Sequence, residues 1–232
     1  MSQQLDISIL LPAYLEEENL RLLLPRIKQS ISQSTPLYEI IVIDTEKPFD
    51  GTPQACIDNN VRYLNRVGGN SYGAAIRTGI FNSRGKKIIF MDADGSHHPE
   101  FIRELYSQKD NADIVIASRY IDGGQTENSG HLVFMSKVVN FGYSFILNIK
   151  CKDVSNSFKL YHGDDLRSLT LKCNNFDIVE EILYKILKNN PKKTIKEIPF
   201  TFKQRMFGET KRNLLTFILT YAITLIRLRF FT

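Results

Sequence analysis

The chain has 232 residues, which suits one domain with a sizeable hydrophobic core. Hydrophobic residues make up 43% and charged residues 24%, which excludes wholesale disorder, and three cysteines without paired spacing exclude a disulfide scaffold and a zinc ribbon. The 30 basic and 25 acidic side chains leave a net charge of +5, which favours phosphate-bearing partners: nucleic acid, an anionic membrane or a phosphorylated small molecule.

Strand-like and helix-like stretches alternate through the first half of the chain. The short apolar runs that predict buried parallel strands lie at residues 7–11, 39–44, 61–64, 87–91 and 113–117. The stretches that predict helices lie between them, at residues 16–30, 52–59, 73–83 and 99–108. This alternation with short connections predicts a doubly wound α/β domain, with a mostly parallel central sheet flanked by helices.

The second half of the chain is less regular. The elements predicted there are a polar loop at 122–130, a helix at 134–149, a strand at 156–161, a helix at 178–189 and an extended segment at 194–202. Because no linker or internal repeat separates them, we predict one domain at residues 1–211 with a C-terminal elaboration at 212–232. The N-terminus lacks a basic region followed by a long apolar run, so we expect no signal peptide and a cytoplasmic protein.

The C-terminal segment concentrates both positive charge and apolar residues. From Lys192 to the end, nine Lys and Arg stand against two Glu, and residues 214–226 form a run of 13 without a charge. A bilayer span needs about 20 apolar residues, so this run is too short to cross comfortably. Because Arg212, Arg227 and Arg229 flank the run, we predict a helix lying at the membrane surface. The alternative is a helix packed on the core of the domain.

The segment IIFMDADGSHHPE, residues 88–100, carries the most informative chemical pattern. The predicted strand delivers Asp92 and Asp94 at its carboxyl end, where ligands bind in open α/β sheets. Two such carboxylates can reach one cation, and hard oxygen ligands select Mg²⁺ or Mn²⁺, which would bridge nucleotide phosphates. The alternative is an acidic turn. His97 and His98 have no cysteine partner, so we predict that one of them packs or hydrogen-bonds to shape the loop.

Other segments supply candidate nucleotide contacts. Tyr14 could stack on a base, and Glu16 or Asp44 could accept hydrogen bonds from a base or ribose. Arg205 offers a fork to two phosphate oxygens and Lys211 a point charge, although both could belong to a solvated basic face. The sequence contains no Ser/His/Asp set and no recognised nucleic-acid module, so we expect neither covalent hydrolase chemistry nor a nucleic-acid partner.

Several of these segments occur together in the order typical of one family. They are PAYLE at 12–16, Asp44 followed by DGT at 50–52, DAD and HHPE within 92–100, SRY at 118–120 and R-x-x-G-x-T-K at 205–211. The chain resembles the inverting family 2 glycosyltransferases of GT-A fold, and within them the dolichyl-phosphate mannose synthase branch of polyprenyl-phosphate glycosyltransferases. The similarity covers nearly the whole chain.

The resemblance implies a role for each matching residue. The residues implied to hold the base and ribose are Pro12, Tyr14, Glu16 and Asp44. The residues implied to contact the sugar nucleotide are Asp92, Ala93 and Asp94, and the implied metal ligands are Asp92, Asp94 and Ser96. The residues implied to contact phosphates are Arg119, Arg205 and Lys211. Asp153, in the segment DVSNSFK, would line the acceptor side, and the implied catalytic set is Asp92, Asp94, Arg119 and Asp153.

The implied activity is metal-dependent transfer of a mannose- or glucose-type hexose from a GDP- or UDP-linked donor to a polyprenyl or dolichyl phosphate, at the inner face of the membrane. A phosphate monoester is already largely dianionic at neutral pH, because its second pKa is about 6, so it can attack without a general base. Where relatives carry a basic cluster, Lys137 is the nearest cation. Two alternatives stay open. One is transfer to a sugar hydroxyl in surface polysaccharide assembly, with Asp153 as the candidate base, and the other is a non-catalytic scaffold.

Overall fold

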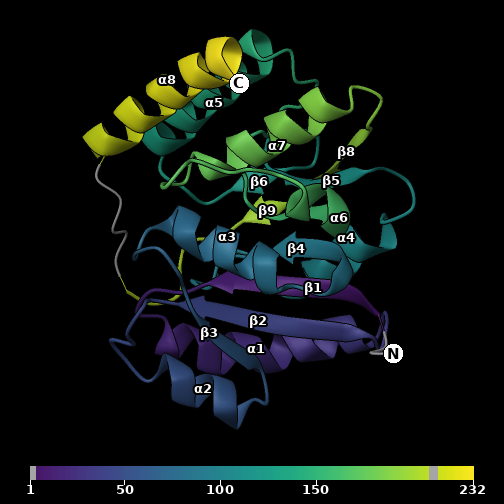
Figure 1. The fold of residues 1–232 in the computed structure, drawn as a ribbon, viewed down its shortest axis with the longest axis vertical. Helices are drawn as coiled ribbons and strands as arrows, with labels where there is room; N and C mark the ends of the chain where they lie inside the picture. Colours follow the sequence, from purple (N-terminus) through teal and green to yellow (C-terminus); the bar gives the residue numbers. More distant parts are fainter. Residues whose placement is uncertain (1–3, 209–213) are drawn as a thin grey trace.

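A seven-stranded mixed sheet forms the centre of the protein, in a computed structural model that describes residues 4–208 and 214–232 (Figure 1). The strand order is β3-β2-β1-β4-β7-β5-β8, and β6 pairs with β9 in a separate ribbon. The strands are β1 (Leu5–Pro12), β2 (Tyr38–Asp44), β3 (Arg62–Asn65), β4 (Gly85–Phe90), β5 (Ile114–Ser118), β6 (Gln125–Thr126), β7 (Lys159–His162), β8 (Ile195–Pro199) and β9 (Thr201–Phe202). Within the sheet only β7 runs antiparallel to its neighbours, β4 and β5.

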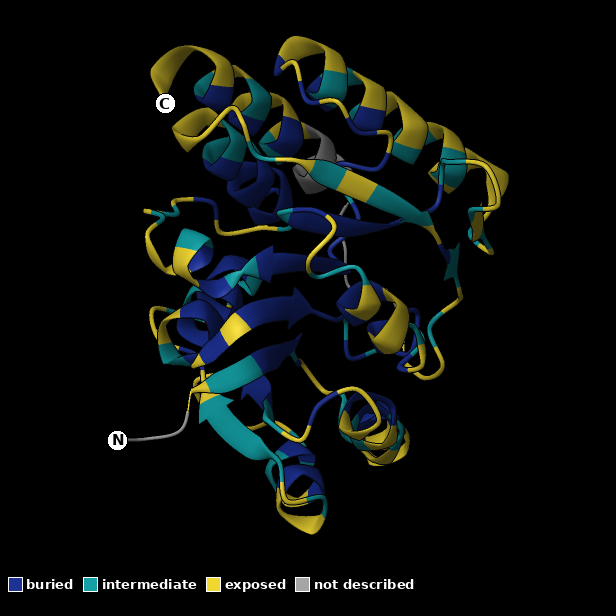
Figure 2. Ribbon diagram, turned by 90° about the vertical axis from the view of Figure 1, so that its right-hand side faces the viewer, coloured by how far each residue is buried: buried dark blue, intermediate teal, exposed yellow. Residues whose placement is uncertain are grey.

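Helices cover both faces of this sheet. They are α1 (Glu17–Ser32), α2 (Thr52–Asp58), α3 (Tyr72–Asn82), α4 (Phe101–Ser107), α5 (Gly130–Ile146), α6 (Gly163–Arg167), α7 (Ile178–Asn189) and α8 (Leu214–Phe231). Helices α1, α2 and α4 pack with Ile9 and Val42 in one hydrophobic cluster, whereas α3, α5, α7 and α8 pack with Leu10 and Ile43 in the other. Neighbouring strand residues point to opposite faces, so continuous apolar strands are buried on both sides (Figure 2).

The structure confirms the predicted alternation of strands and helices, with differences in the second half. The predicted helix at 134–149 begins earlier, at Gly130, and ends at Ile146, while helix α6 and strand β6 were not predicted. The predicted strand at 156–161 starts only at Lys159 and is antiparallel. Its pattern is hard to recognise because Lys159 is fully buried, with its amine donating to the carbonyls of Val154 and Asn156.

The C-terminal helix α8 packs on α5 and α7 through one side (Figure 1). The Tyr143 hydroxyl donates to the carbonyl of Tyr221 at 2.7 Å, the Thr224 hydroxyl donates to Asp177 Oδ2 at 2.5 Å, and Leu228 is fully buried. Packing on the core therefore accounts for that side of the helix. Among the described residues, none of the helices combines the length and apolarity that crossing a membrane requires.

Candidate active site

The first part of the site is a turn, residues 92–96, that directly follows β4 at the edge where the carboxyl ends of β1, β2 and β4 meet. We call it the DAD turn. The backbone N–H and hydroxyl of Ser96 donate to Asp94 Oδ1 at 3.0 and 2.6 Å. Ala93 and Ser96 are buried. Within residues 4–208 and 214–232 Asp94 has no ion pair, so neutral donors are the partners of this carboxylate.

Asp92 is held from three sides. The Ser157 hydroxyl donates to Asp92 Oδ1 at 3.1 Å, and the Tyr72 hydroxyl lies 3.5 Å from the same oxygen. The Asp92 backbone N–H donates to Nδ1 of His97 at 3.0 Å. Because Nδ1 accepts this bond, the proton of the neutral imidazole sits on Nε2, which faces Asn156 Oδ1 at 3.2 Å.

His97 is fully buried and stacks on Phe158 with 4.6 Å between ring centroids. Burial lowers the pKa of this imidazole, so it stays neutral and does not act as a counter-charge to Asp92. The prediction that a histidine shapes this loop by packing and hydrogen bonding is confirmed. The described part of the chain contains no group of three or more His, Cys, Asp and Glu placed to hold a metal, and the assignment of Asp92 and Asp94 as metal ligands stays a prediction.

A loop at residues 203–208 lies against the DAD turn. The Met206 N–H donates to the carbonyl of Asp94 at 2.8 Å, and the Lys203 N–H donates to that of Ser96 at 3.1 Å. Gly95, at φ +85°, makes the approach possible, because a Cβ there would lie 2.4 Å from Cγ of Met206.

Two predicted nucleotide-binding residues meet at this loop. Arg205 Nη2 lies 3.1 Å from Glu16 Oε1, and Asn19 donates to the other Glu16 oxygen at 2.6 Å. This places a cation and a carboxylate, from opposite ends of the chain, beside the turn that carries Asp94. Lys211 lies outside the described residues.

The remaining predicted base and ribose contacts follow β1 and β2. Pro12 ends β1, and the exposed ring of Tyr14 lies 5.9 Å from that of Phe49. Asp44 is buried, and its carboxylate accepts hydrogen bonds from the Thr45 N–H at 2.8 Å and the Tyr63 hydroxyl at 3.1 Å. Burial raises the pKa of this carboxyl. Asp44 thus anchors the loop after β2, with little surface left for a ligand.

Arg66 is a buried cation that sequence reasoning missed. Its Nε donates to the carbonyl of Asp44 at 3.0 Å, and its Nη2 donates to that of Ala13. Its Nη1 donates to the carbonyls of Asn70 and Ser71 at 2.8 and 3.2 Å. One guanidinium therefore ties together the chain after β1, after β2 and before α3. A single arginine in a polar stretch gives no sequence signal for this role.

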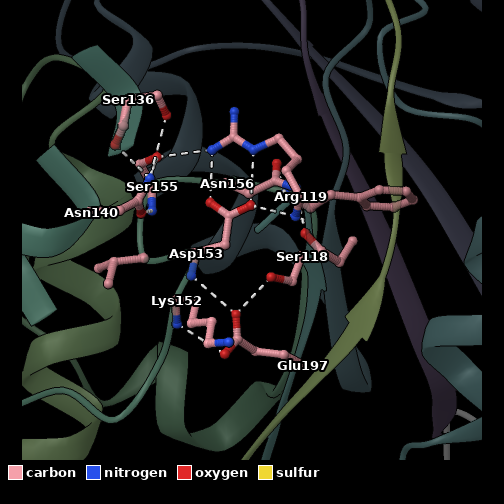
Figure 3. A network of polar contacts seen from close by, with 12 residues as sticks. Ser118, Arg119, Ser136, Asn140, Lys152, Asp153, Ser155, Asn156 and Glu197 are labelled. Carbon is pink, nitrogen blue, oxygen red and sulfur yellow. Dashed lines mark hydrogen bonds and ion pairs between the residues drawn. The ribbon is translucent and has the colours of Figure 1, made fainter. Parts of the chain in front are cut away.

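The second part of the site is a buried ion pair between Arg119 and Asp153 (Figure 3). Nε and Nη2 of Arg119 donate to the two carboxylate oxygens at 2.8 and 2.7 Å, and the Arg119 N–H adds a bond of 2.8 Å. Burial opposes the charge of Arg119, but the facing carboxylate outweighs it and raises the guanidinium pKa. The structure thus brings together these two predicted catalytic residues, and they neutralise each other.

Residues 153–157, DVSNS, connect the two parts; we call them the bridging segment. Asp153 and the Ser155 hydroxyl accept from Arg119, Asn156 faces His97, and Ser157 donates to Asp92. Sequence reasoning singled out Asp153 here but not the three polar residues after it. Their signal is the run of small polar side chains just before a strand.

Glu197 of β8 supports the bridging segment from below in Figure 3. Its Oε1 accepts from the Ser118 hydroxyl at 2.7 Å and the Asp153 N–H at 3.0 Å, and its Oε2 accepts from the Lys152 N–H at 2.9 Å. Glu197 therefore ties the end of β5, beside Arg119, to the backbone of residues 152 and 153.

The sequence profile described as "Glycosyl transferase family 2" matches residues 8–170, which include the DAD turn and the bridging segment. The chain belongs to this family. It is therefore a glycosyltransferase, as the resemblance implied.

Two curated relatives are each 30% identical in sequence to this family 2 glycosyltransferase. The dolichol-phosphate mannosyltransferase of Pyrococcus furiosus is 30% identical over 217 residues, which cover 89% of this chain and 59% of that relative. The undecaprenyl-phosphate mannosyltransferase of Micrococcus luteus is 30% identical over 221 residues, covering 88% of this chain and 86% of the relative. This chain thus spans less than two thirds of the length of the Pyrococcus protein.

Solved structures confirm the GT-A fold. Glucosyl-3-phosphoglycerate synthase from Mycobacterium tuberculosis, in complex with Mn²⁺, uridine diphosphate and glucosyl-3-phosphoglycerate, superimposes with a TM-score of 0.70. The match covers 97% of this chain and 79% of the other. Because the identity is 18%, the match shows the fold alone.

Proposed function

We propose that this glycosyltransferase moves a hexose of mannose or glucose type from a GDP- or UDP-linked donor to a polyprenyl phosphate. The observation that carries the proposal is the DAD turn, whose carboxylates face neutral partners at the carboxyl edge of the sheet. The identity of 30% to two polyprenyl-phosphate mannosyltransferases supports the acceptor, and a neighbour crystallised with UDP-glucose supports the donor class.

The metal would be Mg²⁺ or Mn²⁺, held by Asp92 and Asp94 with Ser96 beside them. Two carboxylates without a cationic partner among the described residues fit a hard divalent cation. Structural neighbours were crystallised with both ions. When bound, the ion would neutralise charge on the leaving diphosphate.

The donor's phosphates would engage Arg205, which now pairs with Glu16, and Lys211. The base and ribose would lie along the ends of β1 and β2, near Pro12 and Tyr14, with Asp44 and Arg66 holding the backbone there. Arg205 would then exchange one carboxylate partner for a diphosphate, which offers a similar pair of oxygens to its fork.

The acceptor's phosphate oxygen would form a bond to C1 of the hexose while the bond from C1 to the donor's phosphate oxygen breaks. The electron pair leaves with the nucleoside diphosphate, and the configuration at C1 inverts. Since the attacking phosphate is already ionised, no side chain has to remove a proton. The protein therefore contributes alignment and charge neutralisation.

A cation near Tyr120 supports an anionic acceptor. The Lys137 amine lies 5.8 Å from the centroid of the Tyr120 ring and has no ion pair among the described residues, whereas Asp153 neutralises the charge of Arg119. Asp153, the base required for a hydroxyl acceptor, is fully buried and has both oxygens bonded to Arg119. These contacts favour transfer to a phosphate over transfer to a sugar hydroxyl. The protein would work at the cytoplasmic face of the membrane, with α8 in contact with lipid.

The test is to incubate the protein with labelled GDP-mannose or UDP-glucose, Mn²⁺ and undecaprenyl phosphate. We expect one donor to give label that extracts into organic solvent. Undecaprenol, which lacks the phosphate, is the matched control and should give none. Label on a free sugar acceptor, with no lipid-linked product from either donor, would overturn the proposal.

A further inference from the structure

A cavity of about 530 Å³ opens where the parallel strands β2 and β3 begin, and we call it the amino-edge cavity. Its lining comes from helix α1, from the first residues of β2 and β3, and from the loops that precede β3 and β4. The DAD turn lies at the opposite edge, because it follows the carboxyl end of β4. The length of β2 separates the cavity from Asp44 by about 20 Å. The amino-edge cavity is therefore distinct from the candidate active site.

Positive charge dominates the lining of this cavity. Lys28, Arg62 and Arg84 contribute three cations, whereas Glu39 is the one carboxylate among the described residues that line it. The Glu39 side chain is buried, while those of Arg62 and Arg84 are 36 and 64% exposed. A concave surface with such an excess of cations attracts an anion.

Glu39 holds the two arginines in place. Its Oε2 lies 3.3 Å from Nη1 of Arg62 and 3.1 Å from Nη2 of Arg84. Its Oε1 accepts hydrogen bonds from the Ser8 hydroxyl and from the Arg84 backbone N–H, each at 2.7 Å. One carboxylate shared by two guanidinium groups balances only one positive charge. The pair is therefore fixed in position before a ligand arrives and retains a charge that an anion would neutralise.

Both guanidinium groups keep N–H donors for a ligand. Within residues 4–208 and 214–232, Arg62 donates only through Nη1, to Glu39 and to one backbone carbonyl, which leaves its Nε and Nη2. Arg84 donates to Glu39 through Nε and Nη2, which leaves its Nη1. The Lys28 amine donates to the carbonyl of Asn59 at 2.8 Å, a neutral partner that does not cancel its charge. A phosphate, with several anionic oxygens, matches this set of donors.

The remainder of the lining is partly apolar. Tyr38 and Val61 are partly buried and pack at the margin of the hydrophobic cluster that contains Ile40. An aromatic ring beside a cation pair suits a flat apolar group on the same ligand, and the cavity has the size of a small-molecule site. We infer that the amino-edge cavity binds a small organic phosphate, with its phosphate between Arg62 and Arg84 and its apolar part against Tyr38.

The test is isothermal titration calorimetry of the full chain with phenyl phosphate, in the absence of donor and metal. We expect binding that weakens as salt rises. Inorganic phosphate should bind at least threefold more weakly because it lacks the ring, and phenol, which lacks the charge, should not bind detectably. Saturation with UDP or GDP and Mn²⁺ should leave the affinity for phenyl phosphate unchanged, because the donor would bind at the other edge of the sheet.

Variants locate the binding site. Arg62→Gln and Arg84→Gln should each lower the affinity for phenyl phosphate at least tenfold. Arg229→Gln is the matched control and should change nothing, because Arg229 is exposed on α8, at the opposite end of the molecule from β3 (Figure 1). Asn60→Asp adds a carboxylate to the lining while both pairs of Glu39 stay intact, so it should lower the affinity about fivefold. Thermal melts check that each variant folds.

Three results would overturn the inference. The first is no binding of phenyl phosphate by the folded wild-type chain at millimolar concentration. The second is displacement of phenyl phosphate by UDP or GDP, or an affinity no higher than that for inorganic phosphate. The third is wild-type affinity in Arg62→Gln and Asn60→Asp. Sugar transfer takes no part in the measurement, so failure of the proposed function would leave the result unchanged.

Discussion

The DAD turn and the Arg119–Asp153 pair are neighbouring regions whose aspartates have different partners. Among the residues that the structure describes, the Asp94 carboxylate accepts only from Ser96, whereas Asp153 receives two guanidinium nitrogens and is fully buried. A carboxylate that accepts hydrogen bonds from neutral donors can still bind a cation. A carboxylate paired with a buried arginine is already neutralised within the protein. The same residue type is therefore a ligand candidate in one region and a structural member in the other.

Asp94→Asn should have the largest effect on activity. We expect kcat/KM to fall on the order of 10³-fold, because the charge that would hold the metal at the diphosphate is lost. The free energy of unfolding should change by less than about 1 kcal/mol, because Asp94 makes no ion pair among the described residues. Steady-state kinetics and urea unfolding measure the two quantities.

Asp122→Asn is the control for that variant, because Asp122 is an exposed carboxylate on the loop after β5. It should keep full activity. Metal-dependent turnover that survives Asp94→Asn intact would show that the DAD turn is not the metal site.

Asp153→Asn should produce the converse result. Removing one partner of a buried ion pair leaves Arg119 uncompensated, so we expect a loss of about 3 kcal/mol in the free energy of unfolding. Urea unfolding measures it. Replacing both partners, with Arg119→Met and Asp153→Leu, should recover part of the loss. Unchanged stability together with abolished transfer to a hydroxyl would instead identify Asp153 as a base.

A smaller effect is expected where the two regions touch. Ser157→Ala removes the hydrogen bond to Asp92 Oδ1, and Tyr72→Phe removes the weaker contact. Together they should lower kcat about five- to tenfold, from about 1 kcal/mol of lost orientation, with KM for the donor little changed. Ser155→Ala is the control, since Ser155 accepts from Arg119 and should affect stability instead. If Ser155→Ala lowered kcat as much as the Ser157→Ala and Tyr72→Phe pair, Ser155 and Ser157 would not have the separate roles proposed here.

The smallest expected effect belongs to Ser96→Ala. The hydroxyl donates to Asp94 at 2.6 Å, but the Ser96 backbone N–H remains to orient the carboxylate. We expect a rise of about two- to fivefold in the Mn²⁺ concentration that gives half-maximal activity, with kcat unchanged. Loss of activity at saturating Mn²⁺ would indicate that Ser96 contacts the metal or donor directly.

The sequence was sufficient for features with a local pattern. Asp92 and Asp94 could be placed at a sheet edge because a buried strand precedes them, and the packing of His97 followed from the absence of partner ligands. The pairing of Asp153 with Arg119, and of Arg66 with the carbonyls of Ala13 and Asp44, could not be predicted, because these partners lie tens of residues apart and nothing in the sequence selects them. The amino-edge cavity was also out of reach, since its cations come from separate segments of the chain.

The loop before α7 links helix α8 to the surroundings of Asp92. Thr224 and Arg227 hold Asp177 and Cys173, and Phe176 of the same loop stacks on Tyr72 at 4.2 Å. Truncation before α8 would therefore not yield a smaller working enzyme: it would expose apolar core and loosen the support of a residue beside Asp92. We therefore expect catalytic activity to require the C-terminal helix.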